Sequence, residues 1–522
     1  MICLAPGTAE EAPPRFLFLK RRLPFRLILL GWSLLCACGM LLICSKSSPL
    51  YPMNDWVDVQ CFFTVGRGIL QGKMPYLDLY EQKGPVLYLL FALAALVSAK
   101  SFGGVFLLEV LCLGVFLFES ARIGELLAPG PRWPLFLLPP VLALLVAVSP
   151  AFSHGGSAEE LCLPALALFL RVTLQAVQED RPLKRGEAFL CGILAALGLW
   201  VKYTFCGLFA GGAAALLLWY LFTRKARALG IALLYGALGI LAVTAPLLLW
   251  FYARGALTAL WQVYFVNNLT AYASCNGAKH AGPLAALLKN WMWSAPAAAG
   301  CLWLWLRPGR RPGQGFLVLC AAVCLGLFTY ANGRTYPYYA LILSVFAGLG
   351  FGPLVWLLQK LPLQDKRGQG LLAGALSLGL LAGCLVAGYR QSGNVYLMAY
   401  EKEDMPQYRF AQLIREDPEA TLLNLGFLDG GFYLASGVEP ESRFFCTFNI
   451  RLAQQDEEHD RLAQQGQVKY IVVRGKQSPG RNYTLIDQCS FLFEGRNWTY
   501  SLYRLSDQPA ERTRRNKKQG SA

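Results

Sequence analysis

Charged side chains are scarce in this sequence. Asp, Glu, Lys and Arg make up 15% of its 522 residues, whereas a soluble domain carries about 25%. They are absent altogether from stretches such as residues 134–148, 230–250 and 337–358. About 20 helical residues cross the hydrocarbon layer of a bilayer. Repeated runs of this kind exclude a soluble globular protein and predict a multi-pass membrane protein.

Metal-ligand spacings are missing as well. The 16 cysteines include no CxxC pair, and most lie inside apolar runs, where cysteine acts as a small buried hydrophobe. Cys446 and Cys489 belong to a polar region near the C-terminus and are the candidates for a disulfide. A signal-peptide cleavage site is also lacking, because residues 45–48 follow the first apolar run without a suitable small-residue motif. We therefore expect a retained first helix with its N-terminus inside.

The charge that is present is mostly positive, with a formal net charge of +16. Nucleic-acid binding is not expected, because the basic residues lie in short loops between apolar runs. Four such loops, at residues 181–185, 224–227, 307–311 and 360–367, are expected to be cytoplasmic by the positive-inside rule. Counting the apolar runs between these loops then places the chain from residue 389 onward outside the cell. The protein is expected in the cell membrane.

One stretch does not fit this parity. Three apolar runs, at residues 85–98, 105–118 and 134–148, separate two loops that should share a side. One run must lie in the interface, re-enter, or continue its neighbour. We expect the first two runs to make a single crossing.

These patterns predict an α-helical polytopic membrane protein, with about 11–13 transmembrane helices, and a small extracytoplasmic α/β domain at the C-terminus. The expected parts are a cytoplasmic segment (1–26), a transmembrane domain (27–389) with an outer catalytic loop (45–84), the α/β domain (390–507) and a basic disordered tail (508–522). The α/β domain is expected because residues 421–425 and 468–473 resemble strands. Residues 404–416 and 449–464 resemble amphipathic helices. Sequons at Asn268, Asn482 and Asn497 would lie outside and matter only in a host that N-glycosylates.

The loop at residues 45–84 concentrates carboxylates, cations and aromatics. A loop of this length between two membrane segments is usually functional. Carboxylates suit a general base acting on a hydroxyl, and Arg and Lys suit phosphate. A solvated loop held by ion pairs is the alternative.

The order of motifs resembles the GT-C superfamily of membrane glycosyltransferases, which includes the protein O-mannosyltransferases and the lipid A aminoarabinose transferase. The resemblance covers nearly the whole chain and is strongest at residues 50–160. It rests on an acidic first outer loop, the stretch PYLDLYEQKGP (75–85), HGGSAEE (154–160), Lys202-Tyr203, GRTYPYY (333–339) and an outer C-terminal domain.

The resemblance implies inverting transfer of a sugar from a polyprenyl-phosphate donor to a hydroxyl or amine on the outer face of the membrane. The family's loop Asp acts as base, and Asp58 matches it best by its spacing from Arg67; Asp55 is the rival, because Val59 stands where many relatives have Glu. The expected partners are the lipid donor, a glycan, lipid or protein acceptor, and membrane lipids. The expected substrate-binding residues are Arg67, Asp78, Glu81, Lys83, Glu159, Glu160, Lys202, Arg334 and Tyr338.

No cofactor is required by this chemistry, and a divalent metal stays open. Glu159 and Glu160 are adjacent in sequence and do not share a helix face, so one metal held by both is not expected. Two other classes of protein remain alternatives: a lipid or polysaccharide transporter or flippase, and a non-catalytic scaffold. A transporter should show internal repeats and several charges in mid-helix. A scaffold would leave Asp58 and Lys83 freely replaceable.

Overall fold

The computed structural model describes residues 15–506, apart from residues 272–281, 308, 310, 332, 362–365 and 494, and leaves the side chains of residues 15–23 and 366–369 undescribed. The helices of the membrane part are α1 (Arg15–Cys44), α2 (Val57–Leu70), α3 (Pro85–Val97), α4 (Gly103–Leu127), η1 (Trp133–Leu137), α5 (Leu138–Ala147), α6 (Ala158–Gln178), α7 (Arg185–Val201), η2 (Tyr203–Phe205), α8 (Cys206–Phe222), α9 (Ala226–Ala253), α10 (Leu257–Leu260), η3 (Trp261–Asn267), α12 (Pro283–Lys289), α13 (Trp291–Leu306), α14 (Pro312–Tyr330), η4 (Pro337–Gly350), α15 (Phe351–Leu358) and α16 (Lys366–Gln391).

The helical membrane architecture predicted from the charge-free runs is confirmed. Within the described residues, 8 helical segments are long and apolar enough to cross a bilayer, and α3 and the η1–α5 pair add two shorter apolar helices. The most apolar window of α6 is 72% buried, whereas that of α9 is 11% buried. An apolar helix with so little protein cover belongs at the lipid-facing edge of the bundle.

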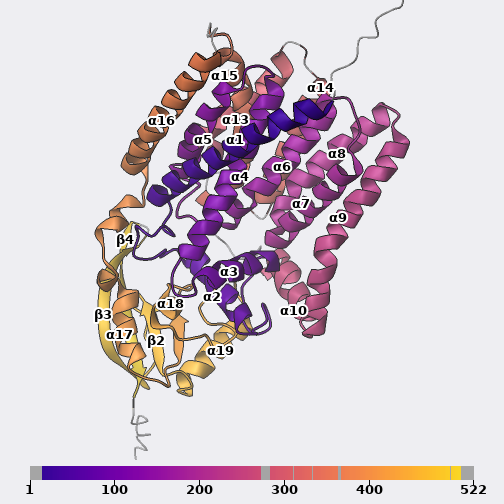
Figure 1. Ribbon diagram of the computed structural model, residues 1–522. Coiled ribbons are helices and arrows are strands. Elements are labelled where there is room, and N and C mark those ends of the chain that lie inside the picture. The colour runs from indigo at the N-terminus through magenta and orange to yellow at the C-terminus, as the bar shows by residue number, and fades with distance from the viewer. Residues whose placement is uncertain are drawn as a thin grey trace, which may run out of the picture.

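The basic loops gather at one end of the bundle, as their parity requires. Lys225 after α8 donates to Asp180 after α6 at 2.9 Å, and Arg307 after α13 donates to the carbonyl of Leu127 at the end of α4 at 2.8 Å. Gln359, after α15, donates to the carbonyl of Ala128 at 3.0 Å. This end lies opposite the β-sheet domain (Figure 1).

The three runs that conflicted with this parity are accounted for by a short helix. α3 has 13 residues, too few to cross a bilayer, whereas α4 has 25. Gly104 at the start of α4 lies directly against the carbonyl of Ala94 in α3. α3 therefore packs against the Gly104 end of α4, and the single crossing of these two runs stays a prediction.

The C-terminal domain is a small α/β unit, also as predicted. Its elements are η5 (Val395–Ala399), η6 (Lys402–Asp404), α17 (Pro406–Arg415), β1 (Leu422–Leu425), α18 (Phe432–Ser436), α19 (Ala453–Gln464), β2 (Tyr470–Arg474), β3 (Tyr483–Phe493) and β4 (Arg496–Leu505). The sheet order is β1-β2-β4-β3. β1 pairs parallel with β2, with Leu423 opposite Ile471, and the other two pairings are antiparallel.

The C-terminal domain contacts α2, the helix formed within the loop at residues 45–84, through a hydrogen bond and an ion pair. Thr64 of α2 donates to Asp429 at 2.6 Å, and Arg67 forms an ion pair with Glu439. Asp429 is fully buried, and this burial raises the pKa of its carboxyl. Polar contacts of this kind fix orientation, so the helix and the domain are held as one unit.

The disulfide considered between Cys446 and Cys489 is wrong, because both are free thiols. Cys446 faces α2 and lies 4.0 Å, sulfur to sulfur, from Cys61. Cys489 is on β3, where its thiol contacts the carbonyl of Ser490.

Candidate active site

Asp58 lies in the first turn of α2. The phenol of Tyr338 donates a hydrogen bond to its Oδ2 atom at 3.0 Å. The side chain is half-buried and lines a cavity of about 720 Å³. A carboxylate that is held by one hydroxyl and reaches open space can accept a proton from a molecule in that space.

Asp55 has a different environment. Its Oδ1 atom is 2.6 Å from the ammonium of Lys46, and the two side chains are 1% and 2% exposed. A buried pair of this kind is a structural element, because removing either partner leaves an uncompensated charge. The carboxylate of Asp58, unlike that of Asp55, is therefore open to a molecule in the cavity.

The cavity beside Asp58 is formed by several separate parts of the chain. Its walls come from the first loop and α2, the loop before α6, the start of η4, the segment after α16 and the sheet domain. They are Lys46, Trp56, Val57, Asp58, Ser153, His154, Tyr336, Pro337, Tyr338, Gly393, Asn394, Tyr396, Leu428, Asn449 and Gly495.

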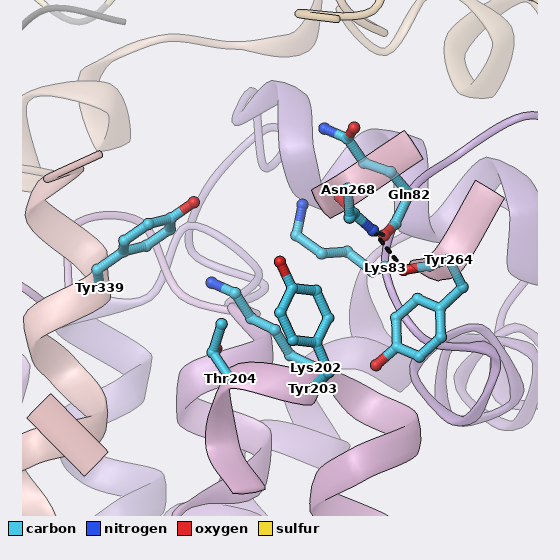
Figure 2. A pocket seen from close by; sticks show the side chains of 8 residues that line it. All are labelled: Gln82, Lys83, Lys202, Tyr203, Thr204, Tyr264, Asn268 and Tyr339. Carbon is cyan, nitrogen blue, oxygen red and sulfur yellow. Dashed lines mark hydrogen bonds between the residues drawn. The ribbon is translucent and has the colours of Figure 1, made fainter. Parts of the chain in front are cut away.

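A second, smaller pocket contains two lysines. It is lined by Gln82, Lys83, Lys202, Tyr203, Thr204, Tyr264, Asn268 and Tyr339. Figure 2 shows the ammonium groups of Lys83 and Lys202 directed into the space that faces Tyr339. Two cations and several hydroxyls around one small space suit a phosphate group.

Lys202 is positioned by the break between two helices. It ends α7 in an extended conformation, before the short η2. Its ammonium is 2.5 Å from Glu159 and 3.8 Å from the ring centroid of Tyr339. The side chain is therefore held in the pocket rather than reaching along the helix end towards water.

Lys83 is positioned by its own loop. Its backbone N–H donates to Glu81 at 2.8 Å, and its ammonium is 3.7 Å from the other oxygen of that carboxylate. Asn268 donates to the backbone carbonyls of Gln82 at 2.8 Å and Tyr264 at 2.9 Å, and Figure 2 shows its amide between these two residues. Asn268 follows η3, a stretch of π-helix, which is a frequent feature of functional sites.

Tyr338 contacts residues of both spaces. Its hydroxyl donates to Asp58 at 3.0 Å, and its ring centroid is 5.7 Å from the ammonium of Lys202. The carboxylate of Asp58 and the ammonium of Lys202 therefore lie near the same aromatic side chain.

Comparison with known proteins identifies the fold. No protein-family model matches the chain, and no curated protein matches it in sequence. Among solved structures, ArnT from Cupriavidus metallidurans bound to undecaprenyl phosphate is similar with a TM-score of 0.59 and 14% identity, over 91% of this chain and 98% of that one. The same ArnT in the apo state gives a TM-score of 0.55. The chain has an ArnT-like fold.

The arabinofuranosyltransferase AftD from Mycobacteria, in a mutant form, is also similar, with a TM-score of 0.51 and 17% identity. The match covers 93% of this chain but 42% of the AftD chain. Both similarities extend over nearly the whole of this chain, so the shared fold includes its C-terminal domain.

Within this fold, two predicted substrate-binding residues lie away from both spaces. Arg67 is at the far end of α2 from Asp58, paired with Glu439. Asp78 caps its own loop by accepting from the backbone N–H of Met74 at 2.6 Å. Both residues shape the contact between the first loop and the rest of the molecule.

The two adjacent glutamates have separate partners. Glu159 pairs with Lys202, whereas Glu160 accepts from the backbone N–H of Gly156 at 2.9 Å. The expectation that they do not share one face is confirmed. Within the described residues, no three His, Cys, Asp or Glu side chains gather closely enough to hold a metal ion.

The two glycines after His154 are required by the packing. Gly155 has φ of +88°, and a Cβ there would come within 2.2 Å of the hydroxyl of Ser45. That hydroxyl in turn donates to Glu109 at 2.6 Å. Only glycine fits this backbone, which presents His154 to the cavity, 5.3 Å between ring centroids from Trp56.

Arg334, the remaining predicted cation, is 4% exposed at the turn before η4 and lines neither of the two spaces described above. Asn268 and Tyr264 line the lysine pocket, but neither was predicted from the sequence to be a site residue. The sequon at Asn268 drew attention to the residue for another reason. Its side chain is buried and bonded to the backbone of Gln82 and Tyr264, so it is no site for a glycan.

Proposed function

We propose that this protein is a membrane glycosyltransferase that moves a sugar from a polyprenyl-phosphate donor to an acceptor hydroxyl or amine. The observation that carries the proposal is the placement of Asp58 at the hydroxyl of Tyr338 and of Lys202 near the ring of the same residue. A transfer of this kind needs a base for the nucleophile and cations for the departing phosphate. The ArnT-like fold supports the same conclusion, since the similar ArnT structure holds undecaprenyl phosphate.

The reaction follows from these positions. The donor phosphate binds at Lys83 and Lys202, and the acceptor lies in the cavity beside Asp58. Asp58 takes the proton of the acceptor O–H or N–H group while that atom forms a bond to the anomeric carbon. The bond from this carbon to the phosphate oxygen breaks, and polyprenyl phosphate leaves with the electron pair. A single displacement from the opposite face inverts the anomeric centre.

The carboxylate is expected to act on the rate of transfer, and the lysines are expected to act on the binding of the donor phosphate. A positioned carboxylate contributes about 10²- to 10⁴-fold as a general base. Charge-assisted contacts to phosphate contribute about 1.5–3 kcal/mol each. Glu81 and Glu159 hold the two lysines at 3.7 Å and 2.5 Å without occupying the pocket between them. We assign them as positioning residues for the donor.

The proposed orientation places the chemistry outside the cytoplasm. Described residues in or beside the basic loops, namely Lys225, Arg307 and Gln359, make their contacts at the bundle end opposite the sheet domain, and basic loops are retained in the cytoplasm. The N-terminus is then cytoplasmic, and the cavity, the lysine pocket and the sheet domain face the extracytoplasmic side.

Release of polyprenyl phosphate tests the proposal. Purified protein is incubated with a panel of polyprenyl-phosphate sugars and a mixture of envelope acceptors, and the released lipid phosphate is measured. Asp58→Asn is the matched control, since it keeps the shape of the side chain but removes the base. Release by the native protein and its loss in Asp58→Asn are expected. Equal release by both proteins, or none from any donor, would refute the proposal.

A further inference from the structure

We propose that the cavity beside Asp58 binds a neutral saccharide, so that the acceptor is the end of a glycan rather than a phosphorylated lipid headgroup or a protein side chain. This inference rests on the proposed function, because it names the acceptor for the same site. It is argued from the walls of the cavity, their charge and their size.

Aromatic faces dominate the walls. Tyr336 and Tyr338 stack with ring centroids 5.7 Å apart and an interplanar angle of 18°, and Trp56 packs edge-on against Tyr338 at 5.2 Å. Tyr396 contributes a further ring from the segment after α16. Sugar rings present faces of C–H groups and edges of hydroxyls, and aromatic side chains with a polar tip match both.

The charge of the walls favours a neutral ligand. Lys46 is the one Lys or Arg among the described lining residues, and its ammonium is compensated by Asp55 at 2.6 Å. Asp58 contributes a carboxylate with no ion-pair partner among the described residues. A phosphate or carboxylate on the acceptor would be repelled by Asp58, and Lys83 and Lys202, the cations that could bind it, line the other pocket.

The polar groups between the rings suit hydroxyls. Asn394 and Asn449 bring side-chain amides, and Ser153 and His154 lie on the loop before α6. Amides and hydroxyls both donate and accept, as a sugar hydroxyl does. The Asn449 amide oxygen already accepts from Gln82 at 3.0 Å. This contact ties the cavity wall to the loop that carries Lys83.

The volume and position point the same way. About 720 Å³ lies within the range of about 300–1,000 Å³ in which pockets enclose most of a drug-sized ligand. Leu428, Asn449 and Gly495 of the sheet domain form one wall, so the acceptor approaches from the side of the polar domain.

Binding without a donor tests this inference separately from the transfer reaction. Full-length protein in lipid nanodiscs is probed with an array of neutral oligosaccharides, the same oligosaccharides carrying phosphate, and Ser/Thr peptides. We expect binding to neutral glycans only, weakened about three- to tenfold by Tyr396→Ala and retained in Tyr396→Phe, which keeps the ring. Tyr389→Ala, at a position 56% exposed on α16, is the control and should bind normally.

Three outcomes would overturn the inference: binding of phosphorylated glycans or peptides in preference to neutral ones, equal binding by Tyr396→Ala and the native protein, or no binding to any neutral glycan at millimolar concentration. Release of polyprenyl phosphate is measured on the same preparation. If release occurs but neutral glycans are not bound, the acceptor class is wrong and the proposed function stands.

Discussion

Asp58 and Asp55 are expected to respond to the same substitution in opposite ways. In Asp58→Asn the amide oxygen still accepts from Tyr338, so at most about 1 kcal/mol of stability is lost. Turnover falls by about 10²- to 10⁴-fold, because the amide cannot take a proton. In Asp55→Asn the ammonium of Lys46 loses a carboxylate at 2.6 Å within a site that is 1% and 2% exposed. Breaking a buried pair in this way costs about 3–5 kcal/mol.

A double variant separates the buried charge from any role in the reaction. Lys46→Met with Asp55→Leu removes both charges, and replacement of a buried ion pair by apolar side chains is often neutral or stabilising. We expect it to recover most of the stability that Asp55→Asn loses and to keep turnover within about tenfold of the native value, since Asp58 is intact.

The assay measures two quantities on one preparation. Thermal denaturation of the detergent-purified protein gives stability, and released polyprenyl phosphate gives turnover. The reasoning fails if Asp55→Asn is as stable as the native protein and inactive while Asp58→Asn keeps its turnover, because the two carboxylates would then have exchanged roles. It fails equally if the double variant is stable and turns over about 10²-fold more slowly.

Four further substitutions test neighbouring parts of the molecule. Lys83→Ala should weaken donor binding about ten- to a hundredfold, measured with a labelled lipid phosphate. Arg67→Ala should loosen the contact of α2 with the sheet domain, which faster proteolysis would reveal, and should change donor affinity less. Asn268→Ala should raise the KM for the donor with kcat largely kept, because the residue holds the Lys83 loop. His459 is 4% exposed, and burial lowers its pKa from 6.5. Its contribution to stability is therefore complete above about pH 6.5 and is lost as the pH falls through the lower folded value. The melting temperature should drop between pH 7.5 and 5.5, and drop less in His459→Gln.

The architecture was predictable in the membrane part, where the exclusion of charge from lipid determines the sequence pattern. Lipid excludes charge, so the apolar runs at 230–250 and 337–358 marked membrane helices, and the basic loops marked one end of the bundle. The β3–β4 hairpin was missed, although Gly495 between the two strands, with φ of +75°, is a turn signal. Its strands are half-exposed and polar, so their apolar alternation is weak.

The candidate site was predictable only in part, because the type of a residue does not reveal whether its side chain is buried or paired in the fold. Asp55 and Asp58 differ by the cation next to one of them, and Lys46 lies outside the motif that drew attention to the loop. Arg67 faces Glu439, which is 372 residues away in sequence, and no local pattern reports such a contact. Lys83 and Lys202 were predictable because each interrupts the chain where a membrane helix begins or ends.

The contacts between the sheet domain and α2 affect when α2 can reach its final position during synthesis of the chain. Thr64 and its partner Asp429 are 365 residues apart, and the partner belongs to the sheet domain, which is made later than α2. At about 5–20 residues per second, the ribosome needs roughly 20–70 s to cover that distance. During that time α2 has been made but lacks the surface that orients it. α2, with Asp58 in its first turn, is therefore held in place only after the sheet domain has been made and has folded.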